Sequence, residues 1–385
     1  MSSPISTFSF PTPTLFGPGT LAELPARLQQ LGGKRPLVVT DAGLLETGAF
    51  AALKRALEAA AGLRWHLFSG VHPNPIDQDV VLAAKEFAAH GCDSVIAFGG
   101  GSALDVGKAC RLLIKRPDLA LAEFNFDDDW CGLAPCVCVP TTAGTGSEVG
   151  RSSVILLEST KRKTVLFHPQ LLARLVILDP ELTVELPPRL TAATGLDALT
   201  HCIESFTSPV FHPLCDGIAL EGIHLIVNAL PRAFRDGRDI EARGQMLVAA
   251  AMGAVAFQKD LGATHSLAHP LSSLCGMHHG TANAVCLSAV MEFNAQRKPG
   301  LYRRVGIAAG LDVVKAGETE ADRRTIAFVK NLVREVGLGD GLGMFGVEEK
   351  HLDALSEQAF ADACHQTNPV PVTRADLRAL YESAM

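Results

Sequence analysis

"SVIAFGGGSALDVGKA" (Ser94–Ala109) predicts a buried strand, a glycine-rich turn and a helix in direct succession. The run Ser94–Phe98 is short and apolar, as expected for a strand in the middle of a sheet. Gly99, Gly100 and Gly101 follow it. Glycines let backbone amides approach a phosphate, and the start of the next helix supplies partial positive charge. Three consecutive glycines here favour phosphate binding over a turn shaped only for geometry, although the pattern is neither GxGxxG nor a Walker loop.

A second turn, "PTTAGTGSEVG" (Pro140–Gly150), follows another apolar run, Cys136–Val139. Its hydroxyl and small side chains suit a ribose or a nicotinamide, and by spacing alone it could equally be a polar loop. Both turns follow the carboxyl ends of predicted strands, where open α/β sheets bind ligands. At the first turn, Ser102 and Asp105 have the spacing of a capping box at the helix start.

The same alternation extends outward from these turns. Pro36–Thr40 and Leu175–Leu178 are predicted strands, and Ala49–Gly62 and Asp77–Gly91 are predicted helices. Strands that alternate with helices indicate a mainly parallel, layered α/β sheet.

The pattern changes at Leu186–Arg189, which we take as the domain boundary. Downstream, nearly all periodic segments are helical: Thr191–Phe206, Pro213–Asn228, Ala242–Phe257, Asp322–Val336 and Val347–Ala363. The expected fold is an α/β, Rossmann-like nucleotide-binding domain over residues 1–187. An all-helical domain over residues 188–385, carrying metal binding and catalysis, is expected to follow it.

Composition and charge argue against two classes of binding partner, nucleic acids and membranes. The chain has 385 residues and a formal net charge of −7, which argues against nucleic acid. Its start lacks the basic and apolar pattern of a signal peptide, and apolar runs such as Met246–Phe257 are shorter than a membrane span. Ten cysteines without a CxxC pair suggest a reducing compartment. We therefore expect a cytoplasmic protein with no membrane or nucleic-acid partner.

Histidines and one aspartate recur at helical spacing. Asp197 and His201 lie four residues apart, which places them on one helix face, and His265 and His269 repeat that spacing. His279 follows. A carboxylate with imidazoles suits Fe(II) or Zn(II) equally well. Pairs of this kind are often structural, so spacing alone leaves metal binding and a structural role open.

Four stretches together resemble the iron-containing (group III) alcohol dehydrogenase family along nearly the whole chain. They are "GGGSALDVGKA", "PTTAGTGSEV", "TAATGLDALTHCIES" and "HSLAHPLSSLCGMHHGTANAV". Within the family, "FQKDLG", "HHGT" and "CHQTNP" are most similar to the 4-hydroxybutyrate dehydrogenases. The resemblance implies an NAD-dependent oxidoreductase that also uses Fe²⁺, with Zn²⁺ possible, and that forms at least a homodimer.

The resemblance also implies roles for individual residues. It makes Asp197, His201, His265 and His279 the metal ligands, places His269 beside the nicotinamide and the reacting carbon as the catalytic residue, and leaves His278 as a neighbour. The family's pyrophosphate turn matches Gly99, Gly100, Gly101, Ser102 and Asp105. Its nicotinamide and ribose contacts match Thr141, Thr142, Thr145 and Lys163.

Asp41 matches the position that accepts the adenosine ribose hydroxyls. A carboxylate there would repel a 2′-phosphate, which favours NAD over NADP. The alternative for Asp41 is a turn or cap residue.

The implied chemistry is reversible oxidation of a short primary alcohol to its aldehyde. Arg151 and Lys259 could receive a substrate carboxylate, with Asn74 and Cys364 lining the same pocket by resemblance; alternatively, both cations are surface or ion-paired residues. Three functions remain open: a dehydrogenase of a hydroxy acid such as 4-hydroxybutyrate, a dehydrogenase of uncharged alcohols or diols, and a metal- and nucleotide-binding protein without turnover.

Overall fold

The structure is a computed structural model that describes residue 9 and residues 12–160, 162–339 and 341–385. Its contacts divide the chain into two compact units. The N-terminal unit contains residues 12–186 and Gly237–Leu247, and the C-terminal unit contains Pro187–Asp236 and Val248–Met385. The sequence predicts one linear boundary, and the return of Gly237–Leu247 to the N-terminal unit differs from that prediction. That segment is tied back by Arg243, whose buried guanidinium donates to the carbonyls of Gly237 and Leu186.

The N-terminal unit is built on a six-stranded, fully parallel sheet. In spatial order its strands are β1 (Thr14–Phe16), β8 (Leu175–Leu178), β5 (Cys136–Pro140), β4 (Ser94–Gly99), β2 (Pro36–Val39) and β3 (His66–Phe68). The chain runs outward from β2 to β3 and then returns to β4, on the other side of β2. The carboxyl ends of β2 and β4 therefore flank the point where the strand order reverses, which is where sheets of this kind bind ligands.

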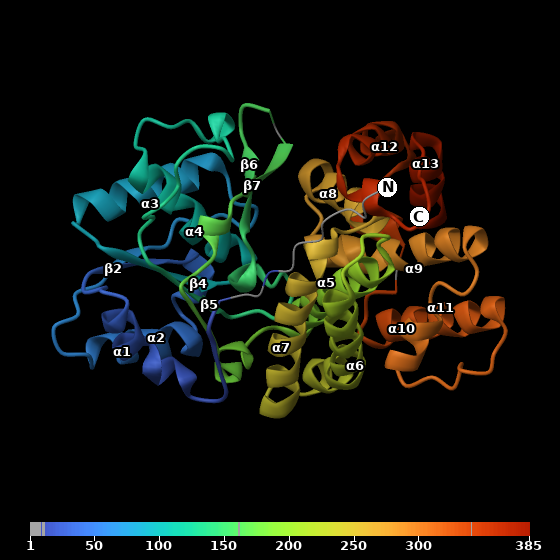
Figure 1. Ribbon diagram of the computed structural model, residues 1–385, viewed down its shortest axis with the longest axis horizontal. Coiled ribbons are helices and arrows are strands. Elements are labelled where there is room, and N and C mark those ends of the chain that lie inside the picture. The colour runs from blue at the N-terminus through green and yellow to red at the C-terminus, as the bar shows by residue number, and fades with distance from the viewer. Residues whose placement is uncertain (1–8, 10–11, 161, 340) are drawn as a thin grey trace, which may run out of the picture. The chain divides into compact units, whose positions relative to one another are not determined.

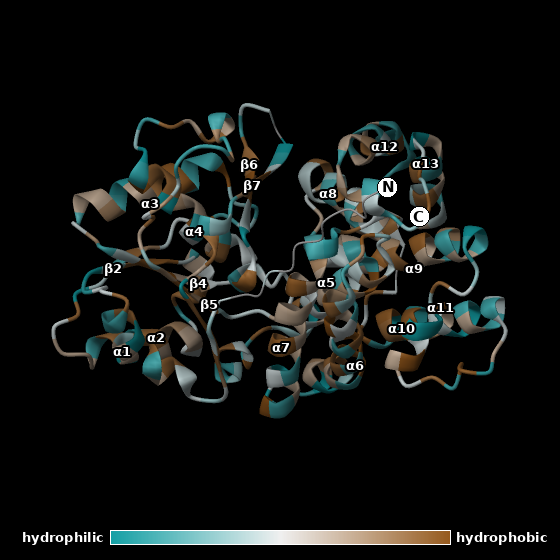
Figure 2. Ribbon diagram, viewed as in Figure 1, coloured by the Kyte–Doolittle hydropathy of each residue, from teal (hydrophilic) through white to brown (hydrophobic). Residues whose placement is uncertain are grey.

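Helices cover both faces of this sheet. Figure 1 shows α1 (Leu24–Gln30) and α2 (Gly48–Glu58) on one side of β2, β4 and β5, and α3 (Asp77–Ala89) and α4 (Gly101–Lys115) on the other. Figure 2 shows hydrophobic colouring on the strands around β4 and β5, whose side chains form the buried core with leucines of α1 and α2.

Two details of this unit position the glycine-rich turn. A Cβ at Gly107 would lie 2.5 Å from the Ala97 Cβ, so glycine at this position lets α4 pack closely on β4. A separate antiparallel hairpin, β6 (Ser152–Leu157) with β7 (Arg162–Phe167), was not anticipated.

The C-terminal unit contains helices and no strand among its described residues, as the sequence predicts. Its helices are α5 (Pro188–Thr207), α6 (Pro213–Arg235), the later part of α7 (Ile240–Ala256), α8 (Ala263–Cys275), α9 (His279–Arg297), α10 (Arg303–Ala308), α11 (Glu318–Glu335), α12 (Leu352–Ala361) and α13 (Arg374–Ser383). Helix α6 continues past the expected end at Asn228 through a buried Pro231. The helix expected over Val347–Ala363 is shorter than predicted.

Helix α5 is the centre of this unit, with 16 of its 20 residues buried. Glycines on its neighbours allow the close approach. A Cβ at Gly222 of α6 would lie 2.7 Å from Cys202 Sγ, one at Gly253 of α7 would lie 3.1 Å from the His201 Cβ, and one at Gly280 of α9 would lie 2.2 Å from the Ala193 carbonyl oxygen. Small residues next to His201 and His279 thus fix where α7 and α9 lie against α5.

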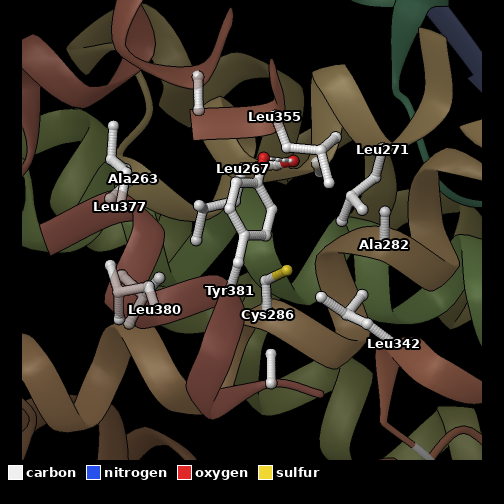
Figure 3. Packing of buried hydrophobic residues seen from close by; sticks show 14 of the residues in the cluster. Ala263, Leu267, Leu271, Ala282, Cys286, Leu342, Leu355, Leu377, Leu380 and Tyr381 are labelled. Atoms are coloured by element: carbon white, nitrogen blue, oxygen red, sulfur yellow. Dashed lines mark hydrogen bonds between the residues drawn. The ribbon is translucent and has the colours of Figure 1, made fainter. Parts of the chain in front are cut away.

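Helix α8 is held by a separate apolar cluster that it shares with α9, α12 and α13. Figure 3 shows Tyr381 of α13 reaching Leu267 of α8, where its hydroxyl donates to the Leu267 carbonyl at 2.7 Å. Leu267 and Leu271 face this cluster, and His265 and His269 leave the helix in other directions.

Two segments, Pro213–Arg235 and Ile240–Lys259, are long and apolar enough to cross a membrane by length and composition alone. This differs from the expectation that no apolar stretch reaches that length. The second segment is mostly buried in the fold, and core helices pass the same test, so the finding is weak evidence for a membrane.

Candidate metal and cofactor sites

The structure brings the four predicted metal ligands together inside the C-terminal unit. Asp197 and His201 come from α5, His265 from α8, and His279 is the first residue of α9. From Asp197 Oδ1, the Nε2 atoms of His279, His265 and His201 lie 3.6, 3.8 and 3.9 Å away. These separations are too long for good hydrogen bonds. They approach the separation of about 3.4 Å between ligands that share a metal with bonds near 2.1 Å. Asp197, His265 and His279 have ligand atoms within 4.8 Å of one another, which fits one divalent metal ion, and His201 lies beside this group.

Glu204 orients one of these ligands. Its Oε2 lies 2.6 Å from His265 Nδ1, and its Oε1 accepts the Thr264 amide at 2.6 Å. Burial opposes ionisation of Glu204, but the hydrogen bonds from His265 and Thr264 prevail and hold its pKa below the ordinary value. A carboxylate on Nδ1 leaves Nε2 as the metal-facing nitrogen. Glu204 was not predicted from the sequence, although its position two helical turns after Asp197 on α5 places both on one face.

Asn283 is a further polar neighbour that the sequence analysis missed. It is fully buried, one turn after His279 on α9, and its Nδ2 donates to Asp197 Oδ1 at 2.6 Å. The same nitrogen lies 3.2 Å from His265 Nε2 and 3.3 Å from His279 Nε2. It therefore helps to fix the ligand carboxylate on α5 relative to α8 and α9.

His269 has its own carboxylate, away from the metal ligands. Its Nδ1 lies 2.8 Å from Asp362 Oδ2, while Asp362 Oδ1 accepts the Ser266 hydroxyl and the Cys364 amide, each at 2.9 Å. Burial opposes ionisation of Asp362, but these contacts hold its pKa well below the ordinary range. The His269 ring stacks on that of His279, with centroids 5.2 Å apart. His269 is thus oriented beside the metal group without joining it.

In the N-terminal unit, the glycine-rich turn differs from the expectation in one respect. Helix α4 begins at Gly101 with Gly100 as its N-cap, and no side chain caps it. Ser102 donates to the Pro73 carbonyl at 2.6 Å, and Asp105 accepts from the Ser147 hydroxyl and, at 3.0 Å, from the Val154 amide. The predicted capping box is therefore wrong, because Ser102 already lies inside the helix. No side chain caps the backbone amides of the first turn of α4. These amides can therefore donate to a phosphate group.

The two predicted cofactor turns pack against each other. A Cβ at Gly101 would lie 2.7 Å from Thr145 Cγ2, and one at Gly100 would lie 3.4 Å from Thr142 Cγ2. The Thr141 amide donates to the Gly99 carbonyl at 3.0 Å. Glycine is needed here for packing as well as for access by a ligand, and Asp105 holds the turn from the α4 side.

Asp41 and Lys163 lie at two further places in this unit. Asp41 follows β2, and its Oδ2 would be 3.6 Å from a Cβ at Gly99, so the carboxylate stands beside the glycine-rich turn. Its side chain makes no cap hydrogen bond, which counts against the cap alternative. Lys163 lies on β7, where it is opposite Leu156 and half-buried.

The predicted substrate residues divide between the two units. Asn74 is half-buried, in a loop that Ser102 contacts through Pro73, and the Arg151 guanidinium lies over the Phe167 ring, 5.3 Å from its centroid. Cys364 follows Asp362, and burial raises the pKa of its thiol well above the ordinary value. Lys259 is 3% exposed, and its ammonium donates to Asp216 and to the Phe206 carbonyl. The ion-paired alternative describes Lys259.

Comparison with known proteins agrees with this arrangement. Residues 11–180 match the family model described as iron-containing alcohol dehydrogenase, and residues 191–385 match that of the family's C-terminal part. The 4-hydroxybutyrate dehydrogenase of Cupriavidus necator is 38% identical, over 95% of this chain and 96% of that protein. A crystal structure of 1,3-propanediol oxidoreductase has a TM-score of 0.95 and 33% identity, covering 99% of this chain and 100% of that one. Sulfoacetaldehyde reductase from Bifidobacterium kashiwanohense, solved with NAD⁺, has a TM-score of 0.89 and 27% identity, covering 99% of each chain.

Proposed function

The chain belongs to the iron-containing alcohol dehydrogenase family, and on that premise we propose that it interconverts a short carboxylate-bearing primary alcohol, such as 4-hydroxybutyrate, and its aldehyde. That it is an oxidoreductase using NAD and a metal follows from the family. The observation that carries the proposal is the convergence of Asp197, His201, His265 and His279, with a separately oriented His269 beside them.

Different residues of this chain are assigned to metal binding, to orientation of a ligand and to proton transfer. A bound metal would supply Lewis-acid polarisation of the alcohol oxygen, and NAD would supply the hydride acceptor. Asp197, His201, His265 and His279 would hold the metal, and Glu204, bound to His265 Nδ1, would leave Nε2 of that ring as the metal ligand. His269 moves the hydroxyl proton: Asp362 accepts from its Nδ1, which leaves Nε2 for the substrate side. An imidazole suits this task because it exchanges protons near neutral pH.

The cofactor is assigned to the N-terminal unit. We propose that the uncapped start of α4 and Gly99–Gly101 receive the pyrophosphate. Thr141, Thr142, Thr145 and Lys163 contact the nicotinamide and its ribose, and Asp41 accepts the adenosine ribose hydroxyls. We further propose that the native metal is Fe²⁺ rather than Zn²⁺, since these ligands suit both and the family is named for iron.

Two observations support an anionic substrate. Arg151 follows the second cofactor turn directly and is partly buried, which strengthens a charge-assisted bond to a carboxylate. The relatives named above include a 4-hydroxybutyrate dehydrogenase and a reductase of sulfoacetaldehyde, which carries a sulfonate. Lys259 is ion-paired with Asp216, so Arg151 is the residue of this chain that the proposal assigns to the substrate carboxylate.

The test is a substrate panel with metal-reconstituted enzyme and NAD⁺. We expect kcat/KM for 4-hydroxybutyrate to exceed that for 1-butanol and 1,3-propanediol. Arg151→Ala should raise KM for 4-hydroxybutyrate about tenfold to a hundredfold, since such a bond contributes roughly 1.5–3 kcal/mol, and leave butanol oxidation nearly unchanged. Arg162→Ala, an exposed arginine on β7, is the matched control. If the unmodified enzyme prefers butanol, it is a dehydrogenase of uncharged alcohols instead.

A further inference from the structure

A second group of possible metal ligands lies in the N-terminal unit, among residues that the proposed reaction does not use. His66 begins the edge strand β3, and Glu86 and His90 are four residues apart at the end of α3. The Nε2 atoms of His66 and His90 lie 3.0 and 3.3 Å from the same oxygen, Glu86 Oε2. The two rings are stacked, with centroids 3.4 Å apart. Two imidazole nitrogens therefore meet at one carboxylate oxygen.

The spacing of these three atoms suits a transition metal. The potential ligand atoms all lie within 4.8 Å of one another. Zinc bound at 2.0–2.1 Å to nitrogen and oxygen ligands requires neighbouring ligand atoms about 3.3 Å apart when the site is tetrahedral. The two printed separations are close to that value. Imidazole nitrogen with carboxylate oxygen is also a common ligand set for Zn²⁺, and it is poor for Mg²⁺ or Ca²⁺, which prefer oxygen.

The surroundings also favour a cation. His90 is the C-cap of α3, so the group stands at the negative end of a thirteen-residue helix. The side chains are 32% (His66), 42% (Glu86) and 46% (His90) exposed, which leaves room for water as a further ligand. One neighbour opposes it: Arg35 approaches Gly91, the residue after His90. The charge of Arg35 near the helix end weakens the site without removing a ligand.

We propose that His66, Glu86 and His90 form a surface site for a zinc-class divalent metal ion, separate from the metal group of the C-terminal unit. Its structural effect follows from where the ligands lie. Strand β3 is a three-residue strand at the edge of the sheet and pairs only with β2 among the described strands. A metal shared by His66 and α3 ties this edge strand to the helix that covers it, and so protects the edge from fraying and from pairing with another chain.

The experiment measures zinc bound per full-length chain by equilibrium dialysis and elemental analysis. The unmodified protein should bind two zinc ions, the second with a dissociation constant below about 10 µM. His265→Ala should remove the ion of the C-terminal unit and keep the one proposed here. His90→Ala and Glu86→Gln should each lose the second ion, and His351→Ala, a half-buried histidine of the other unit, should lose neither.

Amide hydrogen exchange supplies a local readout that does not depend on stoichiometry. Zinc should slow exchange of the β3 amides, His66–Phe68, in the unmodified protein and in His265→Ala, and should have no effect there in His90→Ala. A second ion that survives His90→Ala and Glu86→Gln overturns the proposal, as does binding only at millimolar zinc. If zinc binds but β3 exchanges at the same rate, the structural effect is refuted.

Discussion

The candidate cofactor site of the N-terminal unit and the candidate metal site of the C-terminal unit are built in opposite ways. In the N-terminal unit, the candidate cofactor site is mostly backbone: three glycines, the uncapped start of α4, and two turns in contact. In the C-terminal unit, the metal site consists of side chains, and buried polar groups such as Glu204 and Asn283 orient them. A backbone site is defined by the local strand–turn–helix path. A side-chain site depends on three helices meeting in the right register.

This difference predicts how each site responds to the loss of one side chain. Loss of one side chain from the metal group removes a ligand that nothing else replaces. In the N-terminal unit, a side chain contributes one contact among many, so its loss should change preference or stability and leave binding in place.

The largest effect is expected for His265→Ala. The variant should lose bound metal from the C-terminal unit, and its turnover should fall by about three orders of magnitude or more, equivalent to about 4 kcal/mol. NAD binding, followed by quenching of intrinsic fluorescence, should persist because its site lies in the other unit. Full metal content at that site in this variant would show that the ligand set is wrong.

Glu148 tests the N-terminal unit through its stability. It lies in the second cofactor turn, and burial, together with the charge of Asp105, raises its pKa to about 7 from 4.5, against the opposing charge of Lys108. Between these values the folded state binds the proton more tightly than the unfolded state, so stability falls as pH rises from about 4.5 to about 7. Glu148→Gln removes that loss. It should match the unmodified protein near pH 4 and exceed it by up to about 3 kcal/mol near pH 8.

The measurement is denaturant unfolding followed by tryptophan fluorescence, since both tryptophans, Trp65 and Trp130, lie in the N-terminal unit. Glu158→Gln, an exposed glutamate of the β6–β7 turn, should show no such pH dependence. An equal stability difference at both pH values would mean that Glu148 is not the titrating group.

Glu204→Gln should weaken metal binding without abolishing it. The amide keeps the shape but no longer holds the His265 imidazole as a carboxylate does, and changes of this kind reduce metal affinity about 10- to 100-fold. Competition with a chelator gives the affinity directly. Glu221→Gln, an exposed glutamate of α6, is the control. Unchanged affinity in Glu204→Gln would reduce Glu204 to a structural residue.

The smallest effect is expected for Asp41→Gly. Removing a carboxylate beside the glycine-rich turn should raise the kcat/KM ratio of NADP⁺ to NAD⁺ by about tenfold, because a 2′-phosphate is no longer repelled. Neutralising the nearby exposed Glu46, as Glu46→Gln, should change the ratio little. If the two variants show the same kcat/KM ratio of NADP⁺ to NAD⁺, Asp41 does not contact the adenosine ribose.

Features that depend on neighbouring residues could be predicted from the sequence. Ser94–Phe98 and the three glycines specify a strand and a turn within a few residues, and the switch to helical periodicity near Leu186 marks the second unit. The short edge strands β1 and β3 were missed because three residues carry too little periodicity. The capping box at Ser102 failed because the helix starts two residues earlier than its pattern suggests, with Gly100 as the N-cap.

The sequence by itself therefore determined the α/β and helical parts, the order of the turns, and a set of residues with the chemistry to bind NAD and a metal. Only the tertiary structure decided which polar groups became partners. It paired Glu204 with His265, Asp362 with His269, and Lys259 with Asp216. The two residues of these pairs are 61, 93 and 43 positions apart in the sequence. The residues next to a carboxylate in the sequence do not indicate which distant residue it will pair with. The packing of the helices, which depends on small residues such as Gly253 and Gly280, determines which polar groups come together. A buried charge without a partner would destabilise the fold, so these charged groups lie in pairs.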